Sequence, residues 1–290
     1  MFLDALIWIM IVRPFNSTIV SPMPHLLIVE SNLTTTVKSA RNKGWLSSGE
    51  TYGRALQASG TNVSFDICMP YAEDFQLNCL DLTNYDGFVF TDSSVTWSVG
   101  EVEATVLRQT IEKLFELGKP ILGSCNGLQL ANVVLGGQCG PAPKGKEIGV
   151  ARDINITSEA ISHPIHQGRN QRFSALCFHR DHITKLVTGA VISASNDHSL
   201  VQAMFYEQGN IIFWGMQYHP ELSLDNIINA VSGSAKLFNK DKAFQAELIS
   251  ARENPAGEAA QRLGVLGNDL DPKIHRSELR NWLDRLATTS

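Results

Sequence analysis

Residues 119–134, "KPILGSCNGLQLANVV", join an apolar run to a helix-like run through a corner where one cysteine stands between two glycines. Few architectures turn a buried strand directly into a helix, so this corner constrains the fold. Gly123 and Gly127 permit the tight turn because a Cβ at either position would clash with nearby backbone. Cys125 would then lie at a helix N-terminus, where the dipole favours a thiolate and the Asn126 N–H can face an oxyanion. A cysteine packed under a glycine-rich turn has the same pattern, so the corner alone leaves the chemistry open.

Short apolar runs alternate with amphipathic stretches through the first half of the chain. The expected strands are 25–31, 62–70, 85–92 and 119–125, and the expected helices are 49–60 and 102–118. This alternation predicts an α/β fold with a mostly parallel sheet and helices on both faces. After residue 140, further strand-like runs cover 146–157, 173–183 and 200–220. A turn at 207–210 predicts a hairpin, so we expect these strands to extend the sheet in a partly antiparallel way.

The two ends of the chain differ from its middle. In residues 1–22, the uncharged stretch 5–12 is too short to span a bilayer, and no secretory cleavage site follows it. We expect a disordered or loosely packed extension there, with an interfacial or partner-binding role as the alternative, and a catalytic domain over 23–239. Charged residues number 16 in the last 51, against 37 in the first 239. Residues 240–290 are therefore predicted to form a helical C-terminal appendage. A stripe at helical spacing marks its last helix: Leu279, Trp282, Leu283 and Leu286.

Composition excludes several classes of function. A net charge of −5 gives no electrostatic footprint for nucleic acid. Five scattered cysteines lack disulfide-type or metal-type spacing, which favours a reducing compartment, and we expect a cytoplasmic protein. The histidine pairs 163/166 and 179/182 have a workable ligand spacing but no third ligand placed by sequence. No phosphate loop or dinucleotide fingerprint is present, so we expect neither a metal nor a cofactor.

A second motif supplies what a thiol nucleophile needs. In "FWGMQYHPEL", His219 follows an apolar strand and Glu221 lies two residues further on. The C-terminal ends of strands are where open α/β sheets build their sites. A carboxylate that holds one ring nitrogen of a histidine leaves the other nitrogen free to face a sulfur. Cys125, His219 and Glu221 are therefore predicted to form a catalytic triad.

Taken together, the two motifs resemble the class I (triad) glutamine amidotransferases, especially stand-alone members related to the glutaminase half of GMP synthase. The resemblance covers residues 26–238. It rests on the matching positions Gly123, Cys125, Gly127, Gln129 and Leu130, followed by Gln217, His219, Pro220 and Glu221. It implies a flavodoxin-like open mixed sheet and the hydrolysis of a γ-glutamyl amide through a thioester.

The resemblance also implies roles for residues around the triad. Backbone N–H groups of Asn126 and of the turn at Asp92 would hold the oxyanion, while Ser93, Gln129 and the 178–181 segment would bind substrate. In that segment the implied substrate-binding residues are Phe178, His179 and Asp181. The chain departs from the family pattern twice, since Asp92 stands where a glycine is expected and Phe178 where serine is common. Aspartate tolerates left-handed backbone geometry better than most residues, so the turn can survive the first change.

Three functions are compatible with these motifs. The first is hydrolysis of N-substituted γ-glutamyl amides to glutamate and an amine, as in amine or aniline breakdown. The second is a glutaminase that delivers ammonia to a separate synthetase partner, since the tail is too small to be a synthetase. The third is a binding or regulatory protein that has lost activity. The altered turn, the added aromatic residues and the missing synthetase favour the first. A small-molecule amide substrate is expected in either enzyme, with a synthetase or a homo-oligomer contact as the possible protein partner.

Overall fold

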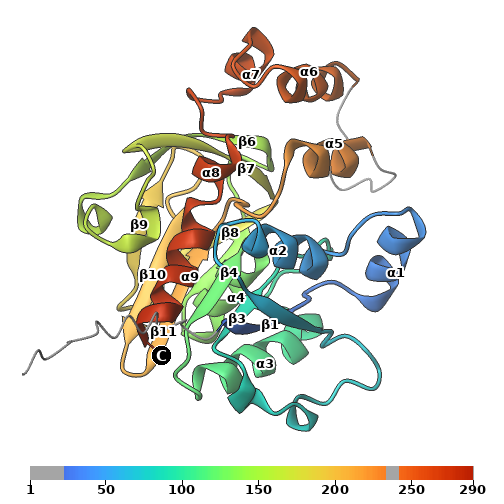
Figure 1. The fold of residues 1–290 in the computed structure, drawn as a ribbon, viewed down its shortest axis with the longest axis vertical. Helices are drawn as coiled ribbons and strands as arrows, with labels where there is room; N and C mark the ends of the chain where they lie inside the picture. The colour runs from blue at the N-terminus through green and yellow to red at the C-terminus, as the bar shows by residue number, and fades with distance from the viewer. Residues whose placement is uncertain (1–22, 233–241, 290) are drawn as a thin grey trace, which may run out of the picture.

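The computed structural model describes residues 23–232 and 242–289 of the chain, so the expected extension over 1–22 lies outside the described residues. Nine strands form one sheet in the order β2-β1-β3-β4-β11-β10-β9-β6-β7 (Figure 1). The five strands from β2 to β11 pair in parallel, and β10, β9, β6 and β7 continue the sheet through antiparallel pairs. A separate two-stranded sheet pairs β5 with β8.

The elements have the following bounds. The helices are α1 Thr34–Asn42, α2 Ser48–Gln57, α3 Thr105–Phe115, α4 Asn126–Val134, α5 Leu224–Ser232, α6 Lys242–Glu253, α7 Glu258–Leu263, α8 Pro272–His275 and α9 Ser277–Thr289. The strands are β1 His25–Val29, β2 Ser64–Cys68, β3 Gly87–Phe90, β4 Ile121–Ser124, β5 Gln138–Pro141, β6 Glu147–Ile156, β7 Arg172–His179, β8 Asp181–Lys185, β9 Val191–Ser195, β10 Ala203–Gln208 and β11 Ile211–Met216. Among the described residues, no helix is both long and apolar enough to cross a membrane.

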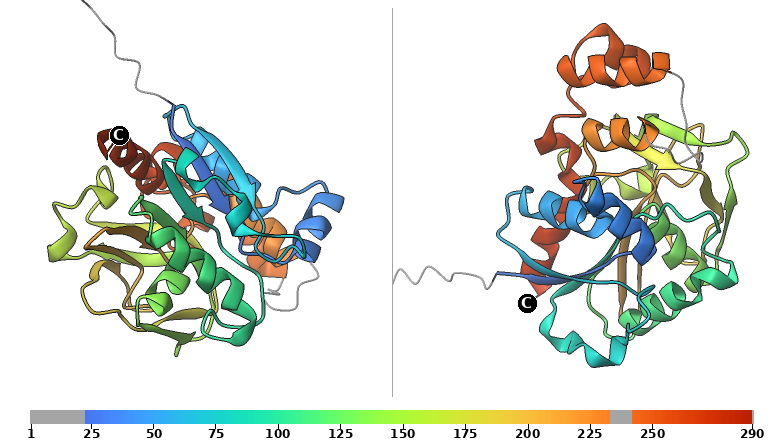
Figure 2. Two further views of the ribbon diagram at one scale, coloured as in Figure 1. Left: turned by 90° about the horizontal axis from the view of Figure 1, so that it is seen from below. Right: turned by 90° about the vertical axis from the view of Figure 1, so that its right-hand side faces the viewer.

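Helices cover both faces of the parallel half of the sheet, as the alternating pattern predicts (Figure 2). One face packs against α2 and α9, and its core includes Tyr52 and Leu56 of α2. The opposite face packs against α3 and α4, with Leu114 and Leu128 in its core. The central strands β1, β3 and β4 are almost entirely buried on both faces, and apart from His25 and Ser124 their residues are apolar. The α/β class and the mixed sheet of the prediction are therefore confirmed.

The C-terminal helix α9 lies across the sheet instead of standing apart from it (Figure 1). Its four stripe residues, Leu279, Trp282, Leu283 and Leu286, are at most 1% exposed and share a core with Leu26 and Leu122 of the sheet. Helices α6 and α7 form a further layer with α5, which packs on Val150 and Leu176 of the antiparallel strands. The division of the chain at residue 239 stays a prediction. The contacts show that α9 is part of the main core.

Replacing Trp282 with alanine tests how much α9 contributes to the stability of the fold. Trp282 is fully buried, and the change leaves a large cavity against β3, where Gly87 lies close beneath the indole. We expect the free energy of unfolding in urea to fall by about 3–5 kcal/mol. The control is Trp45→Ala, because Trp45 is 38% exposed. An equal cost for the two variants would contradict the packing described here.

Candidate functional site

Cys125 occupies the corner between β4 and α4 in a strained conformation, with φ of 49° and ψ of −98°. Its N–H donates to the Met216 carbonyl at 2.7 Å, which ties the corner to β11. There is no room for larger residues on either side of it. A Cβ on Gly123 would lie 2.7 Å from the Gly127 backbone, and one on Gly127 would lie 2.6 Å from the Phe90 carbonyl oxygen. The predicted elbow is therefore present, and its glycines are required by close backbone approach.

His219 follows β11 at the same edge of the sheet and is fully buried. Its Nδ1 donates to Glu221 Oε1 at 2.7 Å, while Nε2 has no hydrogen-bond partner among the described residues. Burial by itself lowers the pKa of His219, but the Glu221 carboxylate and the Cys125 sulfur outweigh it and raise that pKa well above its usual value. The structure thus brings the three predicted triad residues together, with one ring nitrogen held and the other left for the sulfur.

A residue that the sequence analysis missed holds the second oxygen of Glu221, and another, Tyr52, supports it. Ser124 donates to Glu221 Oε2 at 3.0 Å, and Tyr52 on α2 lies 2.9 Å from the Ser124 hydroxyl oxygen. All three side chains are buried. Because both carboxylate oxygens are then occupied, Glu221 can hold His219 in one orientation. Ser124 immediately precedes the cysteine in sequence, but nothing in the motif shows that its side chain points toward the carboxylate.

The C-terminal segment braces the loop that carries His219. His275 of α8 donates from Nε2 to the carbonyls of His219 and Leu222, at 2.9 and 3.1 Å. Burial lowers the pKa of His275 to about 3, so the ring is neutral at pH 7 and keeps its role as a donor. Next to the loop, Tyr218 donates to Glu278 Oε1 at 2.8 Å, and Arg169 pairs with both oxygens of Glu278.

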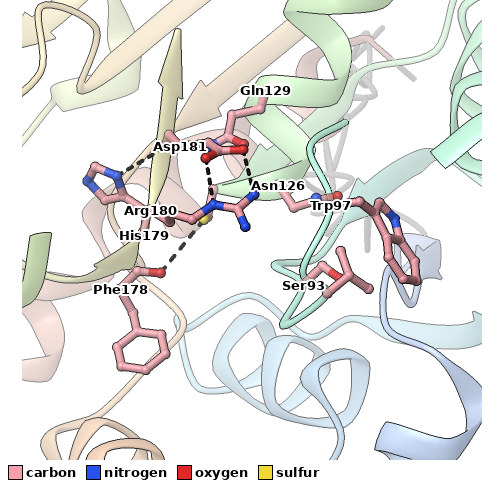
Figure 3. A pocket seen from close by; sticks show the side chains of 10 residues that line it. Ser93, Trp97, Asn126, Gln129, Phe178, His179, Arg180 and Asp181 are labelled. Carbon is pink, nitrogen blue, oxygen red and sulfur yellow. Dashed lines mark hydrogen bonds and ion pairs between the residues drawn. The ribbon is translucent and has the colours of Figure 1, made fainter. Parts of the chain in front are cut away.

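A small polar cavity of about 40 Å³ opens beside Cys125 (Figure 3). Its wall includes six residues assigned to the site from sequence: Ser93, Asn126, Gln129, Phe178, His179 and Asp181. Arg180, which lies in the predicted 178–181 segment but was not singled out there, also lines it. The Arg180 guanidinium pairs with both oxygens of Asp181 at 2.7 and 2.9 Å, as the dashed lines in Figure 3 show. An adjacent cation and anion match the carboxylate and ammonium of an α-amino acid.

The predicted substrate-binding residues differ in the hydrogen bonds that they make to other protein groups. Gln129 donates to the Asp181 carbonyl at 2.8 Å and to Gln217 Oε1 at 3.1 Å. His179 has both ring nitrogens within hydrogen-bond distance of protein oxygens, at Asp181 and Glu147. The Ser93 hydroxyl donates to the Ser31 carbonyl. The structure places these residues at the cavity, and their contact with substrate stays a prediction.

Phe178 contributes to the site in an unexpected way. Its backbone carbonyl accepts from Cys125 Sγ at 3.9 Å, so the main chain of Phe178 is the part that touches the nucleophile. Its ring points away from the Arg180–Asp181 pair (Figure 3). The ring packs on the apolar cluster that includes residues of α5. The side chain therefore faces a different region from the small cavity.

The turn at Asp92 follows β3 and faces the triad. Among residues 23–232 and 242–289, the non-glycine residues with positive φ are Cys125 and Asp153, so Asp92 does not use left-handed geometry. The Asp92 carbonyl accepts from Thr91 Oγ1 at 2.8 Å and from Asn32 Nδ2 at 3.4 Å. Burial raises the pKa of Asp92 to about 6, opposed by the charge of His219 and reinforced by that of Glu221. Its carboxyl group therefore lies near the triad, which the family pattern does not predict.

One cluster of side chains carries atoms that could ligate a metal. Neither of the two histidine pairs considered from sequence is complete in this cluster. Glu147, His179 and His198 offer ligand atoms within 4.8 Å of one another. Glu147 Oε2 accepts from His179 and Gln202, each at 2.8 Å, and its Oε1 accepts from Asn196 at 2.9 Å. His198 has its own oxygen partners at Ser199 and Gly145. These side chains form a hydrogen-bonded cluster behind the small cavity.

The fold and site define a class of α/β proteins with an elbow cysteine, a strand-end histidine and a carboxylate on one open sheet. A model of the class-I glutamine amidotransferase family matches residues 55–231. The chain belongs to this family.

Particular relatives extend the match over most of the chain. The γ-glutamyl-L-1-hydroxyisopropylamide hydrolase of Pseudomonas sp is 30% identical over 280 residues, covering 91% of this chain and 93% of that protein. The γ-glutamyl peptidase 5 of Arabidopsis thaliana is 28% identical over 60% of this chain and 70% of that protein. The crystal structure of a glutamine amidotransferase from Thermotoga maritima has a TM-score of 0.58 at 19% identity. It covers 91% of this chain and 98% of that chain, and it shows the same fold.

Ser124→Ala tests the support of Glu221. The variant removes one hydrogen bond to a buried carboxylate, a loss of about 1.5–3 kcal/mol when the partner is charged. We expect kcat for amide hydrolysis to fall about tenfold or more, with KM nearly unchanged, because Ser124 positions the triad without facing the small cavity. Ser59→Ala is the control, since its hydroxyl bonds only the Ala55 carbonyl of α2. A KM increase without loss of kcat would contradict a positioning role.

Asp92→Asn tests the charge at the turn. Because folding raises the pKa of Asp92 to about 6, its contribution to stability is complete below about pH 4 and is lost as pH rises through 6. Asparagine has no titrating carboxyl group, so the variant does not lose stability as pH rises through 6. The variant should therefore be more stable than the wild type at pH 8, on the order of 1 kcal/mol, and equal to it at pH 4. Thermal melts at pH 4, 6 and 8 measure this, with the exposed Asp197→Asn as control. A pH-independent difference would contradict it.

Proposed function

We propose that this protein hydrolyses γ-glutamyl amides by cysteine-dependent acyl transfer, with N-substituted amides as its substrates. The single observation that carries the proposal is the arrangement of Cys125, His219 and Glu221 at one sheet edge, with His219 Nδ1 held at 2.7 Å and Nε2 unpartnered among the described residues. The activities named for the Pseudomonas and Arabidopsis relatives support the substrate class.

In the first half of the reaction the Cys125 thiolate attacks the γ-carbonyl carbon. The N–H of Asn126, which has no partner within its own helix, and the turn at Asp92 hold the oxygen as it becomes negative. When the tetrahedral intermediate collapses, the C–N bond breaks and His219 Nε2 gives its proton to the departing amine. The product at this stage is a glutamyl thioester on Cys125 and a free amine.

In the second half, water attacks the thioester carbon while His219 accepts its proton. The C–S bond breaks, and glutamate leaves with the thiolate restored. The salt-bridged Arg180 and Asp181 are suited to the α-carboxylate and α-ammonium of the glutamyl group, and Gln129 supports them from α4. The polar cavity beside Cys125 thus suits the acyl half of the substrate, which is common to all γ-glutamyl amides.

The family name points to a second candidate, a glutaminase that supplies ammonia to a separate synthetase. Glutamine is the simplest γ-glutamyl amide, and the same triad would cleave it. The two candidates differ in the leaving group and in the need for a partner. An N-substituted amide is hydrolysed by the enzyme alone, whereas an ammonia-supplying subunit gains activity when its acceptor protein is present.

The proposal is tested by glutamate release from glutamine and from a series of N-alkyl and N-aryl γ-glutamyl amides. We expect N-substituted amides to be turned over faster than glutamine, and Cys125→Ala to lower every rate by more than about 1000-fold. A glutamine-mimicking electrophile should add to Cys125, as seen by mass spectrometry. The control is Cys79→Ala, which removes an exposed thiol and should change neither result. Absence of both turnover and adduct would identify a binding protein that has lost activity.

A further inference from the structure

A second cavity, of about 420 Å³, lies next to the polar one and is far larger. The two share Ser93 and Phe178 in their walls, so the large cavity begins where the small one ends. Its volume falls within the range of about 300–1,000 Å³ that is typical of small-molecule sites. No step of the reaction described above uses it.

The large cavity lies on the histidine side of the site. Its wall includes Asp92, and the charge of His219 lowers the pKa of the Asp92 carboxyl group, against the larger effect of burial. It also includes Leu222, whose carbonyl shares the His275 donor with the His219 carbonyl. The leaving nitrogen must receive its proton from His219, so the substituent on that nitrogen departs toward this side.

The wall of the cavity combines hydroxyl, amide and carboxyl groups with apolar side chains, and the apolar side chains gather on two elements. The loop before α2 contributes Trp45 and Leu46, which are 38% and 37% exposed, and α5 contributes Ile227 and Ala230. Phe178 separates the cavity from the Arg180–Asp181 pair, and its ring points away from that pair (Figure 3). Exposed large apolar side chains gathered around a concave surface mark a site that binds an apolar group. Glutamine, which carries only an NH₂ on this side, would leave the cavity unfilled.

We infer that this cavity is the leaving-group subsite and that it selects γ-glutamyl amides whose amine carries an apolar, ring-sized substituent. The inference rests on the proposed function, since it assigns the second half of the same substrate. The ring lies between Trp45 and α5, and the scissile nitrogen stays at the junction formed by Ser93 and Phe178. The departing amine, once protonated by His219, leaves past the Asp92 carboxylate.

Ala230→Trp tests the assignment by filling the cavity from α5. The measured quantity is the ratio of kcat/KM for γ-glutamylanilide to kcat/KM for glutamine. We expect this ratio to fall at least tenfold, since loss of one apolar contact surface in a specificity pocket is worth about 10–200-fold. Leu46→Ala removes part of the opposite wall and should lower the ratio by a smaller factor. Its matched control is Leu117→Ala, because Leu117 is 36% exposed and lies just after the C-terminal end of α3.

Binding to inactive enzyme gives a second readout. In Cys125→Ala protein, γ-glutamylanilide should bind at least tenfold more tightly than glutamine, and Ala230→Trp should remove that advantage. An unchanged ratio in folded Ala230→Trp enzyme that still hydrolyses both amides would overturn the subsite and leave the proposed function intact. Failure of the wild type to hydrolyse any γ-glutamyl amide, with no adduct on Cys125, would overturn both.

Discussion

The strained corner at Cys125 is the constraint on which the site depends. A φ of 49° at a non-glycine residue is costly, and it persists because β4, α4 and the Met216 carbonyl fix the backbone on every side. Gly123 and Gly127 let the helix approach β3 and β4 closely enough for the turn to close. The conformation directs the sulfur out of the sheet, toward the carbonyl of Phe178 and the ring of His219. A relaxed backbone here would turn the same thiol into a packing group.

The other half of the site is held from the far end of the chain. Glu278 of α9 is a buried carboxylate: burial raises its pKa, but Arg169 and His166 outweigh that effect and lower it. Tyr218 also donates a hydrogen bond to Glu278. Breaking such a buried pair leaves an uncompensated charge, so the cluster anchors α9 firmly beside β11. With α9 in place, α8 presents His275 to the two carbonyls of the His219 loop. The charged C-terminal segment is thus structurally coupled to the base, although it lies outside the part of the chain that the family model matches.

Sequence reasoning recovered the parts of the molecule that are specified locally. The apolar runs of β1, β3 and β4 predict strands because both faces of the central parallel sheet are buried, and the two motifs locate Cys125, His219 and Glu221. It missed Ser124 and Tyr52 and did not single out Arg180 within the 178–181 segment, because the roles of these residues depend on where their side chains point after folding. It also gave no sign that the stripe on α9 packs against Leu26 and Leu122, some 160 residues or more away along the chain. An apolar helical face shows that something will cover it, but not what does.

The two cavities that meet near Cys125 impose different physical demands on a substrate. On one side the space is about 40 Å³, enclosed by charged and amide groups that require a particular set of partners. On the other side the space is about 420 Å³, and part of its wall is apolar. Burying an apolar group against that part of the wall is favourable and requires little directional precision. If the proposed function holds, such a site would be strict about the acyl group and would tolerate different apolar groups on the amine. Under the proposed function, strictness on the glutamyl side would follow from the Arg180–Asp181 pair, whose charges must stay matched when the cavity fills. Breadth on the amine side follows from the loop at Trp45 and from α5, since these elements can vary without disturbing the corner at Cys125 or the anchoring of His219.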